Sequence, residues 1–241
     1  PTRRSSDLDR GEVSGPYGDP DEFFRSTHMT GGLELVLRSG CQRLATGVGP
    51  SVIGLQTNFG GGKTHTMLAL LHVARAPDPS LLQGVSSIIG SDAPGLKGAK
   101  AVAFSGSDKG PDQPLIYAGS KAVRTIWGYI AYRLAGEEGL SLVAGAEEAG
   151  TNPGGEALEK VLRAAGGPAL VLLDEIVAYV KQLDGERYEA NLAFFQSLTE
   201  AATRVPQALI VGSLPESEDE SGGDRGRETL RRLEKLFGRL Q

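Results

Sequence analysis

The sequence is poor in cysteine, in aromatic residues and in long apolar runs. Among 241 residues there are one cysteine, Cys41, and three histidines, and 6% of the residues are aromatic. A single cysteine excludes an intrachain disulfide and a cysteine-based metal cage, which fits a reducing compartment. The longest apolar runs, such as Ala169–Leu173, are too short to cross a bilayer. We therefore expect a soluble, cytoplasmic protein without a membrane contact.

Neither sign of charge strongly dominates the sequence. Lys and Arg number 25 and Asp and Glu number 30, which leaves a net charge of −5. This balance argues against a nucleic-acid-binding surface spread over the whole domain. Hydrophobic residues make up 39% and charged residues 23%, as in an ordinary globular protein. The length is sufficient for one domain with a sizeable core.

Both ends of the chain depart from this globular pattern. The first residues, PTRRSSDL, resemble translated sequencing-adapter sequence, and we exclude residues 1–12 from fold reasoning. The amphipathic pattern LEKLFGRLQ at the other end carries no helix-stop signal, so we expect a fragment of a longer protein that lacks the final core strand and a lid. The other expected divisions are an N-terminal segment with a helix that begins near Thr30 (13–50), a core (51–214), a mobile acidic loop (215–228) and the start of a truncated helix (229–241).

Four short apolar runs, rich in Val, Ile and Leu, predict buried β-strands at 51–56, 100–106, 168–174 and 207–213. Polar and apolar residues do not alternate within these runs, as expected for a parallel sheet covered on both faces. Helical patterns lie around and between them, at 64–76, 121–135, 156–165 and 188–203. This alternation predicts an α/β fold with three layers and a mainly parallel sheet.

A glycine-rich stretch, TNFGGGKTH, follows the first predicted strand and opens a predicted helix. Glycines let the backbone bend so that its N–H groups face phosphates, and the helix adds its unsatisfied N-terminal N–H groups. In such a P-loop, Lys63 would neutralise the β- and γ-phosphates of ATP and the Thr64 hydroxyl would bind Mg²⁺. The predicted nucleotide-contacting residues are Thr57, Asn58, Phe59, Gly60, Gly61, Gly62, Lys63, Thr64 and His65.

The loop departs from the usual pattern G-x-x-x-x-G-K-[ST] because Thr57 stands where the first glycine belongs, so a plain glycine-rich turn is an alternative. A second motif, ALVLLDE, favours the nucleotide site. It is an apolar strand that ends in two carboxylates, at the strand end where open parallel sheets bind ligands. There Asp174 would hold Mg²⁺ and Glu175 would orient or deprotonate an attacking water. The alternative is a solvated pair of acids after a strand.

The distance between the two motifs leaves room for a further strand, because Asp174 follows Lys63 by 111 residues (174 − 63). Such a strand is typical of the division of P-loop ATPases that carry a catalytic glutamate. In that division the strand after the acidic motif lies between the two motif strands and ends in a polar residue that senses the γ-phosphate. Ser213 is the candidate for this role. We expect strand 51–56 at an edge of the sheet, covered if at all by N-terminal residues.

With these motifs, the chain resembles the AAA+ ATPase family catalogued as domain of unknown function 499. The resemblance rests on DPDEFFRSTHMTGGL, LQTNFGGGKTHTMLAL, RTIWGYIAYRL, LVLLDEIVAYV and SLPESEDE, and it makes Thr57 a feature of the family. It implies ATP hydrolysis with Mg²⁺, a homo-oligomer, and conformational work in DNA restriction or phage defence. The partners it implies are DNA methyltransferases or helicases, whose genes often lie beside those of the family.

Other functions stay open at this point. The sequence has no N-K-x-D element to read guanine, which disfavours GTP. A small-molecule kinase could share the phosphate loop, but the adjacent Asp174 and Glu175 favour hydrolysis. An ATP-binding switch or scaffold that does not hydrolyse ATP fits the same motifs. Finally, Phe23, Phe24 and Met29 are candidates for an adenine wall, with core packing as the alternative.

Overall fold

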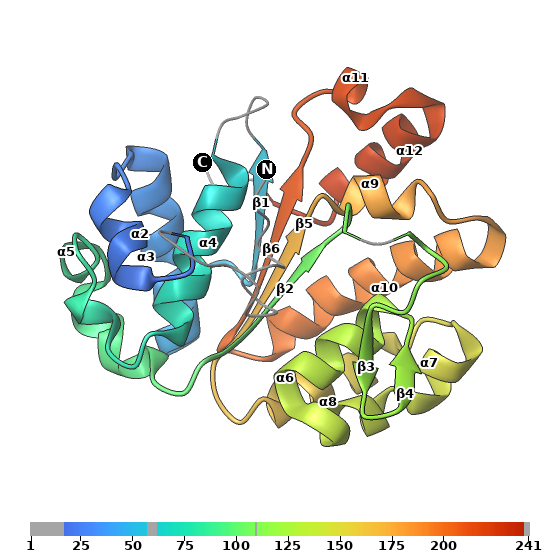
Figure 1. Cartoon of the computed structure of the whole chain (residues 1–241), viewed down its shortest axis with the longest axis horizontal. Helices are drawn as coiled ribbons and strands as arrows, with labels where there is room; N and C mark the ends of the chain where they lie inside the picture. The colour runs from blue at the N-terminus through green and yellow to red at the C-terminus, as the bar shows by residue number, and fades with distance from the viewer. Residues whose placement is uncertain (1–16, 57–61, 109, 239–241) are drawn as a thin grey trace.

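The computed structural model describes residues 17–56, 62–108 and 110–238. Its centre is a parallel four-stranded sheet with the order β1-β6-β5-β2 (Figure 1). These strands are β1 (Val52–Gln56), β2 (Lys100–Ser105), β5 (Ala169–Asp174) and β6 (Ala208–Leu214). The predicted α/β fold with a mainly parallel sheet is confirmed, and each of the four predicted strands lies within one residue of its expected bounds.

Helices cover both faces of the sheet, and a two-stranded antiparallel hairpin stands apart from it. The longer helices are α3 (Gly31–Thr46), α4 (Lys63–Arg75), α6 (Ile126–Leu142), α8 (Gly154–Ala164), α10 (Gly185–Arg204) and α12 (Gly223–Glu234). The shorter ones are α2 (Pro20–Ser26), α5 (Ser86–Ile89), α7 (Ala144–Ala149), α9 (Ile176–Val180), α11 (Glu218–Ser221) and the 3₁₀ helices η1 (Pro79–Leu81) and η2 (Gly90–Leu96). The hairpin consists of β3 (Ile116–Ala118) and β4 (Lys121–Val123).

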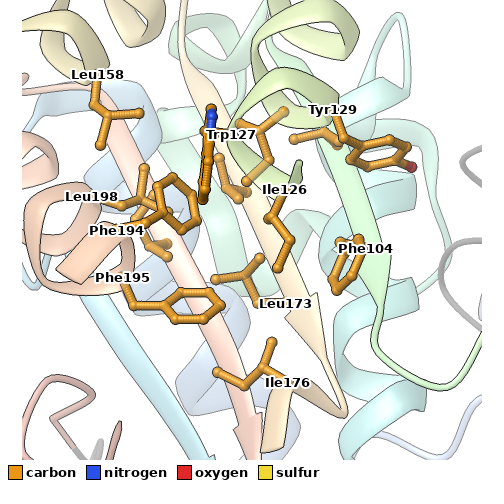
Figure 2. Packing of buried hydrophobic residues seen from close by; sticks show 14 of the residues in the cluster. Phe104, Ile126, Trp127, Tyr129, Leu158, Leu173, Ile176, Phe194, Phe195 and Leu198 are labelled. Atoms are coloured by element: carbon orange, nitrogen blue, oxygen red, sulfur yellow. The ribbon is translucent and has the colours of Figure 1, made fainter. Parts of the chain in front are cut away.

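Two apolar cores result, one on each face of the sheet, because successive side chains of a strand point to opposite faces. Along β5, Leu170 and Leu172 belong to the core under α2, α3 and α4. Val171 and Leu173 belong to the core under α6, α8 and α10. Figure 2 shows this second core, in which Trp127 of α6 packs against Phe194 of α10 with ring centroids 5.5 Å apart. All six residues of β5 are buried, which explains its uninterrupted apolar sequence.

The helices before and after the glycine-rich loop begin where the sequence predicts. Thr30 caps α3, and its side chain accepts a hydrogen bond from the N–H of Leu33. The helix α4 begins at Lys63, directly after the glycines. Buried Arg43 fastens the far end of α3 to the sheet, because its guanidinium donates to five backbone carbonyls, those of Gly47, Gly49, Ala202, Val205 and Ala208.

The expected helix 121–135 is wrong in its first residues. Residues 121–123 form β4, and α6 begins at Ile126 with Thr125 as its cap. Glu147 of α7 explains this start, because its buried carboxylate accepts hydrogen bonds from the N–H groups of Arg124 and Thr125. The start of the helix therefore depends on a carboxylate more than twenty residues further along the chain.

The expected loop 215–228 is also replaced by helix. Residues 218–221 form α11, and α12 begins at Gly223 and ends at Glu234. The polar sequence conceals an apolar stripe: Leu230 and Leu233 are buried against the core under α10. Two ion pairs and a cation–π contact hold the other side of α12 to α10, through Arg225 with Asp184, Arg232 with Glu189, and Arg225 over the Tyr188 ring.

The strand β1 is the edge of the four-stranded sheet, as predicted. We expected N-terminal residues to cover the free edge of β1, and this was wrong. The C-terminal end of the described chain covers it instead, since the Gly54 N–H donates a 2.7 Å hydrogen bond to the carbonyl of Gly238. Phe237 packs beside this contact over paired glycines of β1 and β6. A Cβ on Gly212 would lie 2.5 Å from the Phe237 ring, and one on Gly54 would lie 3.1 Å from the Phe237 carbonyl oxygen, so Gly212 makes room for the ring and Gly54 for the backbone.

Candidate functional site

The first wall of the candidate site is the start of α4. Gly62 precedes the helix with φ of 81°, a left-handed conformation that glycine adopts at little cost. Lys63 and Thr64 are the first two residues of α4, and its first turn carries no acidic residue. The N–H groups of such a turn and the helix dipole favour an anion. The predicted contacts Thr57, Asn58, Phe59, Gly60 and Gly61 lie outside the described residues.

The two sequence motifs meet through a hydrogen bond. The Thr64 hydroxyl donates to Asp174 Oδ2 at 2.9 Å, which joins the start of α4 to the end of β5. Ser213, near the end of β6, donates from its hydroxyl to the other oxygen, Oδ1. Asp174 and Ser213 are 4% and 3% exposed, so the carboxylate is held by two hydroxyls in a largely dry setting. The structure thus brings together three of the predicted site residues from three separate elements.

The environment of Asp174 shifts its pKa. Burial raises the pKa of this carboxyl above its usual value of 3.8, and the neighbouring Glu175 charge raises it further. Hydrogen bonds from Ser213, Thr64 and the Glu175 backbone act in the opposite direction, because they stabilise the carboxylate. A buried carboxylate with a raised pKa gains from a cation, which restores the electrostatic stabilisation that water would have given.

Glu175 has an unusual backbone. Its φ of 52° is the only positive value for a non-glycine residue in the described part of the chain. Its N–H donates to Ser213 Oγ at 2.9 Å, which ties the turn to the neighbouring strand. The Ser107 hydroxyl, just beyond β2, donates to the Glu175 carboxylate. A conformation that is held against a backbone preference by neighbouring groups is characteristic of functional sites.

These residues line a cavity of about 440 Å³ at the carboxyl ends of the strands. Its walls come from the start of α4, the ends of β5 and β6, and the segments of α9 and α11. Its lining residues include Gly62, Lys63, Thr64, His65, Asp174, Glu175, Val177, Ala178, Lys181, Ser213, Leu214, Pro215, Glu220 and Ser221. All the described residues that the sequence singled out for phosphate, metal or catalysis are therefore in one cavity.

The aromatic candidates for an adenine wall belong to the core. Phe23 and Phe24 are buried at 1% and 2% exposure, and neither they nor Met29 line this cavity. Phe23 stacks on the ring of His65 with a centroid distance of 4.5 Å. His65 Nε2 also lies 3.0 Å from Thr27 Oγ1, and burial lowers the pKa of the histidine. His65 thus links the start of α4 to α2 as well as lining the cavity.

Three residues of the site were not found from the sequence. Ser107 and Lys181 follow β2 and α9 without a motif, and Glu220 sits in the acidic stretch that we expected to be a loop. Ser107 could have been found from its position, because it follows the strand that neighbours the acidic motif in a parallel sheet. Lys181 follows Asp174 by seven residues, and only the turn at Glu175 and the short α9 bring it back to the cavity.

Comparison with known proteins gives the family. The model of the family described as DUF499 N-terminal domain matches residues 5–238, so the chain belongs to this family. No curated protein and no solved structure matches the chain significantly. In the described part of the chain, no helix has the length and apolar character that crossing a bilayer requires. Within residues 17–56, 62–108 and 110–238, His, Cys, Asp and Glu do not gather in groups of three or more that could hold a metal ion.

Proposed function

We propose that the chain binds ATP and hydrolyses it with Mg²⁺ at the carboxyl edge of its parallel sheet. The observation that carries the proposal is the hydrogen bond from Thr64 to Asp174 inside a cavity that Lys63 and Glu175 also line. A phosphate-binding helix start needs a cation and N–H donors, and hydrolysis needs an oxygen ligand for the metal and a base for water. The cavity offers one candidate for each requirement.

The donor set at Asp174 fits Mg²⁺. This ion prefers oxygen ligands, keeps several waters, and is held through one or two carboxylates plus phosphate oxygens rather than by a cage of protein groups. Thr64 Oγ1 and the Asp174 carboxylate supply such oxygens, and their mutual hydrogen bond places them side by side. When bound, Mg²⁺ neutralises the charge that develops on the phosphates. Because the pKa of Asp174 is raised, acid protonates this carboxyl more readily, and Mg²⁺ affinity should fall as it does.

Each remaining residue has a role that follows from its place. Lys63, at the start of α4, binds the β- and γ-phosphates as a point charge. Glu175 accepts the proton of the attacking water, because its carboxylate lines the cavity beside the metal ligand. Ser213 donates to Asp174 and accepts the Glu175 N–H, so its hydroxyl fixes both acids. In this proposal it reports the presence of the γ-phosphate to β6.

The wider role in this proposal is that of an AAA+-type ATPase. The hydrolysis would drive conformational work in DNA restriction or phage defence, as a homo-oligomer and with DNA methyltransferase or helicase partners. The motif resemblance described from the sequence motivates this part. The placement of β6 between β1 and β5 also supports it, since that order is expected of P-loop ATPases with a catalytic glutamate.

The test separates binding from hydrolysis. Glu175→Gln should retain ATP binding and lower kcat by about 10²–10⁴, the usual contribution of a general base. Lys63→Ala should weaken ATP binding itself. Matched controls are Glu186→Gln in α10 and Lys160→Ala in α8, two exposed side chains away from the cavity. Equal turnover in wild type and Glu175→Gln would remove the catalytic assignment.

A second function has one observation in its favour. In the structure the Glu175 carboxylate accepts a hydrogen bond from Ser107, which leaves fewer of its lone pairs for a water. An ATP-binding switch or scaffold that does not hydrolyse ATP would keep its glutamate in this state. Tight ATP binding without turnover, at every protein concentration tested, would favour this second function over hydrolysis.

A further inference from the structure

Lys181 is a second lysine in the wall of the cavity. It caps the C-terminal end of α9, the five-residue helix that starts directly after Glu175. At about 1.5 Å of rise per residue, so short a helix keeps Lys181 close to the acid pair. Among the lining residues it shares the cavity with Lys63, Asp174 and Glu175. Glu175 and Lys181 flank α9 at its two ends, so both belong to the same wall of the cavity.

The ammonium group of Lys181 has a neutral partner. Its Nζ donates to the carbonyl of Ser221 at 3.0 Å. Within the described part of the chain it forms no ion pair, although the side chain is half-buried. Removing a cation from water without a counter-charge is costly, so an ammonium in this state is stabilised when an anion arrives. Lys181 is therefore suited to bind an anion in the cavity.

The contact between Lys181 and Ser221 depends on glycine. Gly222 follows with φ of 75°, and a Cβ on it would lie 2.8 Å from Lys181 Nζ. Gly223 also has a positive φ, of 77°. The two glycines form the joint between α11 and α12, and Lys181 holds the chain at this joint. If the Lys181 ammonium moves, its hydrogen bond to the Ser221 carbonyl would move the segment 215–222 with it.

We propose that Lys181 binds the terminal phosphate of ATP while it retains the Ser221 carbonyl, and so couples the γ-phosphate to the segment 215–222. This inference rests on the proposed function, because it requires ATP in the cavity. An ammonium has three donors, which allows it to serve a carbonyl and a phosphate oxygen together. ADP lacks the phosphate that Lys181 would reach, so the coupling distinguishes ATP from ADP.

The charges of the cavity support this role. Asp174, Glu175 and Glu220 are the carboxylates among its lining residues, and Lys63 and Lys181 are the lysines. A nucleoside triphosphate brings further negative charge into a site that already has an excess of acids. Repulsion between like charges increases as the dielectric constant falls towards that of a protein interior. A second ammonium in the cavity wall lowers this repulsion.

The test uses a variant that keeps a donor and removes the charge. Lys181→Gln retains an N–H for the Ser221 carbonyl, Lys181→Arg retains the charge, and Lys160→Gln is the control on an exposed lysine that pairs with Glu156. The probes are ADP and the non-hydrolysable β,γ-imido analogue of ATP, with Mg²⁺, in titration calorimetry. We expect Lys181→Gln to weaken the ATP analogue by about tenfold, as for the loss of one hydrogen bond to a charged group, with ADP changed by less than about twofold. Lys181→Arg and Lys160→Gln should stay close to wild type.

Hydrogen exchange, measured on wild type and on Lys181→Gln, gives an independent test. The amides of 215–222 should exchange more slowly with the ATP analogue than with ADP, and this difference should disappear in Lys181→Gln. Equal losses for both nucleotides, or equal protection of 215–222 by both, would overturn the role of Lys181 while leaving ATP binding intact. Wild type that binds neither nucleotide would refute the proposed function, and the role of Lys181 with it.

Discussion

The substitution Gly106→Ala adds one methyl group where the end of β2 approaches the turn at Glu175. Gly106 lies buried between Ser105 and Ser107, and its N–H donates to the carbonyl of Asp174 at 2.9 Å. A Cβ on Gly106 would lie 2.9 Å from the carbonyl carbon of Glu175 and 2.9 Å from Tyr179 Cβ, and still closer to the Glu175 carbonyl oxygen. The substitution Gly106→Ala therefore presses directly on the turn that carries the acid pair.

The size of the effect follows from what the methyl group meets. Its nearest neighbours are backbone atoms and the Cβ of a buried tyrosine, none of which can rotate away as the end of a flexible side chain can. Overpacking of this kind costs about 1–3 kcal/mol. At about 2–4 °C per kcal/mol for a chain of this size, the melting temperature should fall by about 2–12 °C. Glu175 must also move, so ATP hydrolysis should decrease further than ATP binding.

The assay compares Gly106→Ala with Gly110→Ala. A Cβ on Gly110 meets nothing within 4 Å, and neither glycine has a positive φ, so the control makes the same change without the contact. Thermal unfolding and ATP turnover of both variants are measured against wild type. If Gly106→Ala has the same melting temperature as Gly110→Ala and hydrolyses ATP as fast as wild type, the close approach between the end of β2 and the Glu175 turn is refuted.

Two more substitutions test the interior of the protein. Asp174→Asn should raise the free energy of unfolding of the nucleotide-free protein at neutral pH by about 0.5–2 kcal/mol, the size common for a single stabilising substitution. The sign follows from the raised pKa, because Asp174 binds its proton more tightly in the folded chain than in the unfolded one. Wild type therefore loses stability as the pH rises through the pKa of folded Asp174. Urea denaturation should show that the stability gained by Asp174→Asn at neutral pH vanishes in acid. Arg43→Met should lower the free energy of unfolding by about 2–4 kcal/mol, because buried carbonyls lose their donor, while Arg38→Met on the exposed side of the same helix should change it little.

The sheet and the central part of the site could be predicted from the sequence because both depend on short-range patterns. An apolar run without alternation predicts a strand buried on both faces, and β5 has this environment along its whole length. The carboxyl ends of parallel strands lie at one edge, so Asp174 and Ser213 could be expected near the helix that follows β1. The structure confirms this arrangement through the hydrogen bonds of Asp174 to Thr64 and Ser213.

The errors share a physical cause, which is contact between residues distant in sequence. The late start of α6 depends on the Glu147 carboxylate, which no local pattern at 121–125 reveals. The stretch 215–228 is polar by composition, yet residues beyond it decide its structure, because Leu230 and Leu233 anchor α12 in the core. Lys181 reaches the cavity only because Glu175 turns the chain with a positive φ.

The register of the sheet explains why the polar residues of the site meet. Leu173 of β5 pairs with Gly212 of β6, so Asp174 and Ser213 come next, side by side, and Ser105 of β2 pairs with Asp174 itself. A slip of one residue would turn every side chain of a strand to the opposite face. The slip would place each large apolar side chain of β5 in a space shaped for another one, a packing mismatch of about 1–3 kcal/mol. The two apolar cores therefore fix the position of Asp174 against Ser213, and the chemistry proposed at this edge depends on packing several residues away from it.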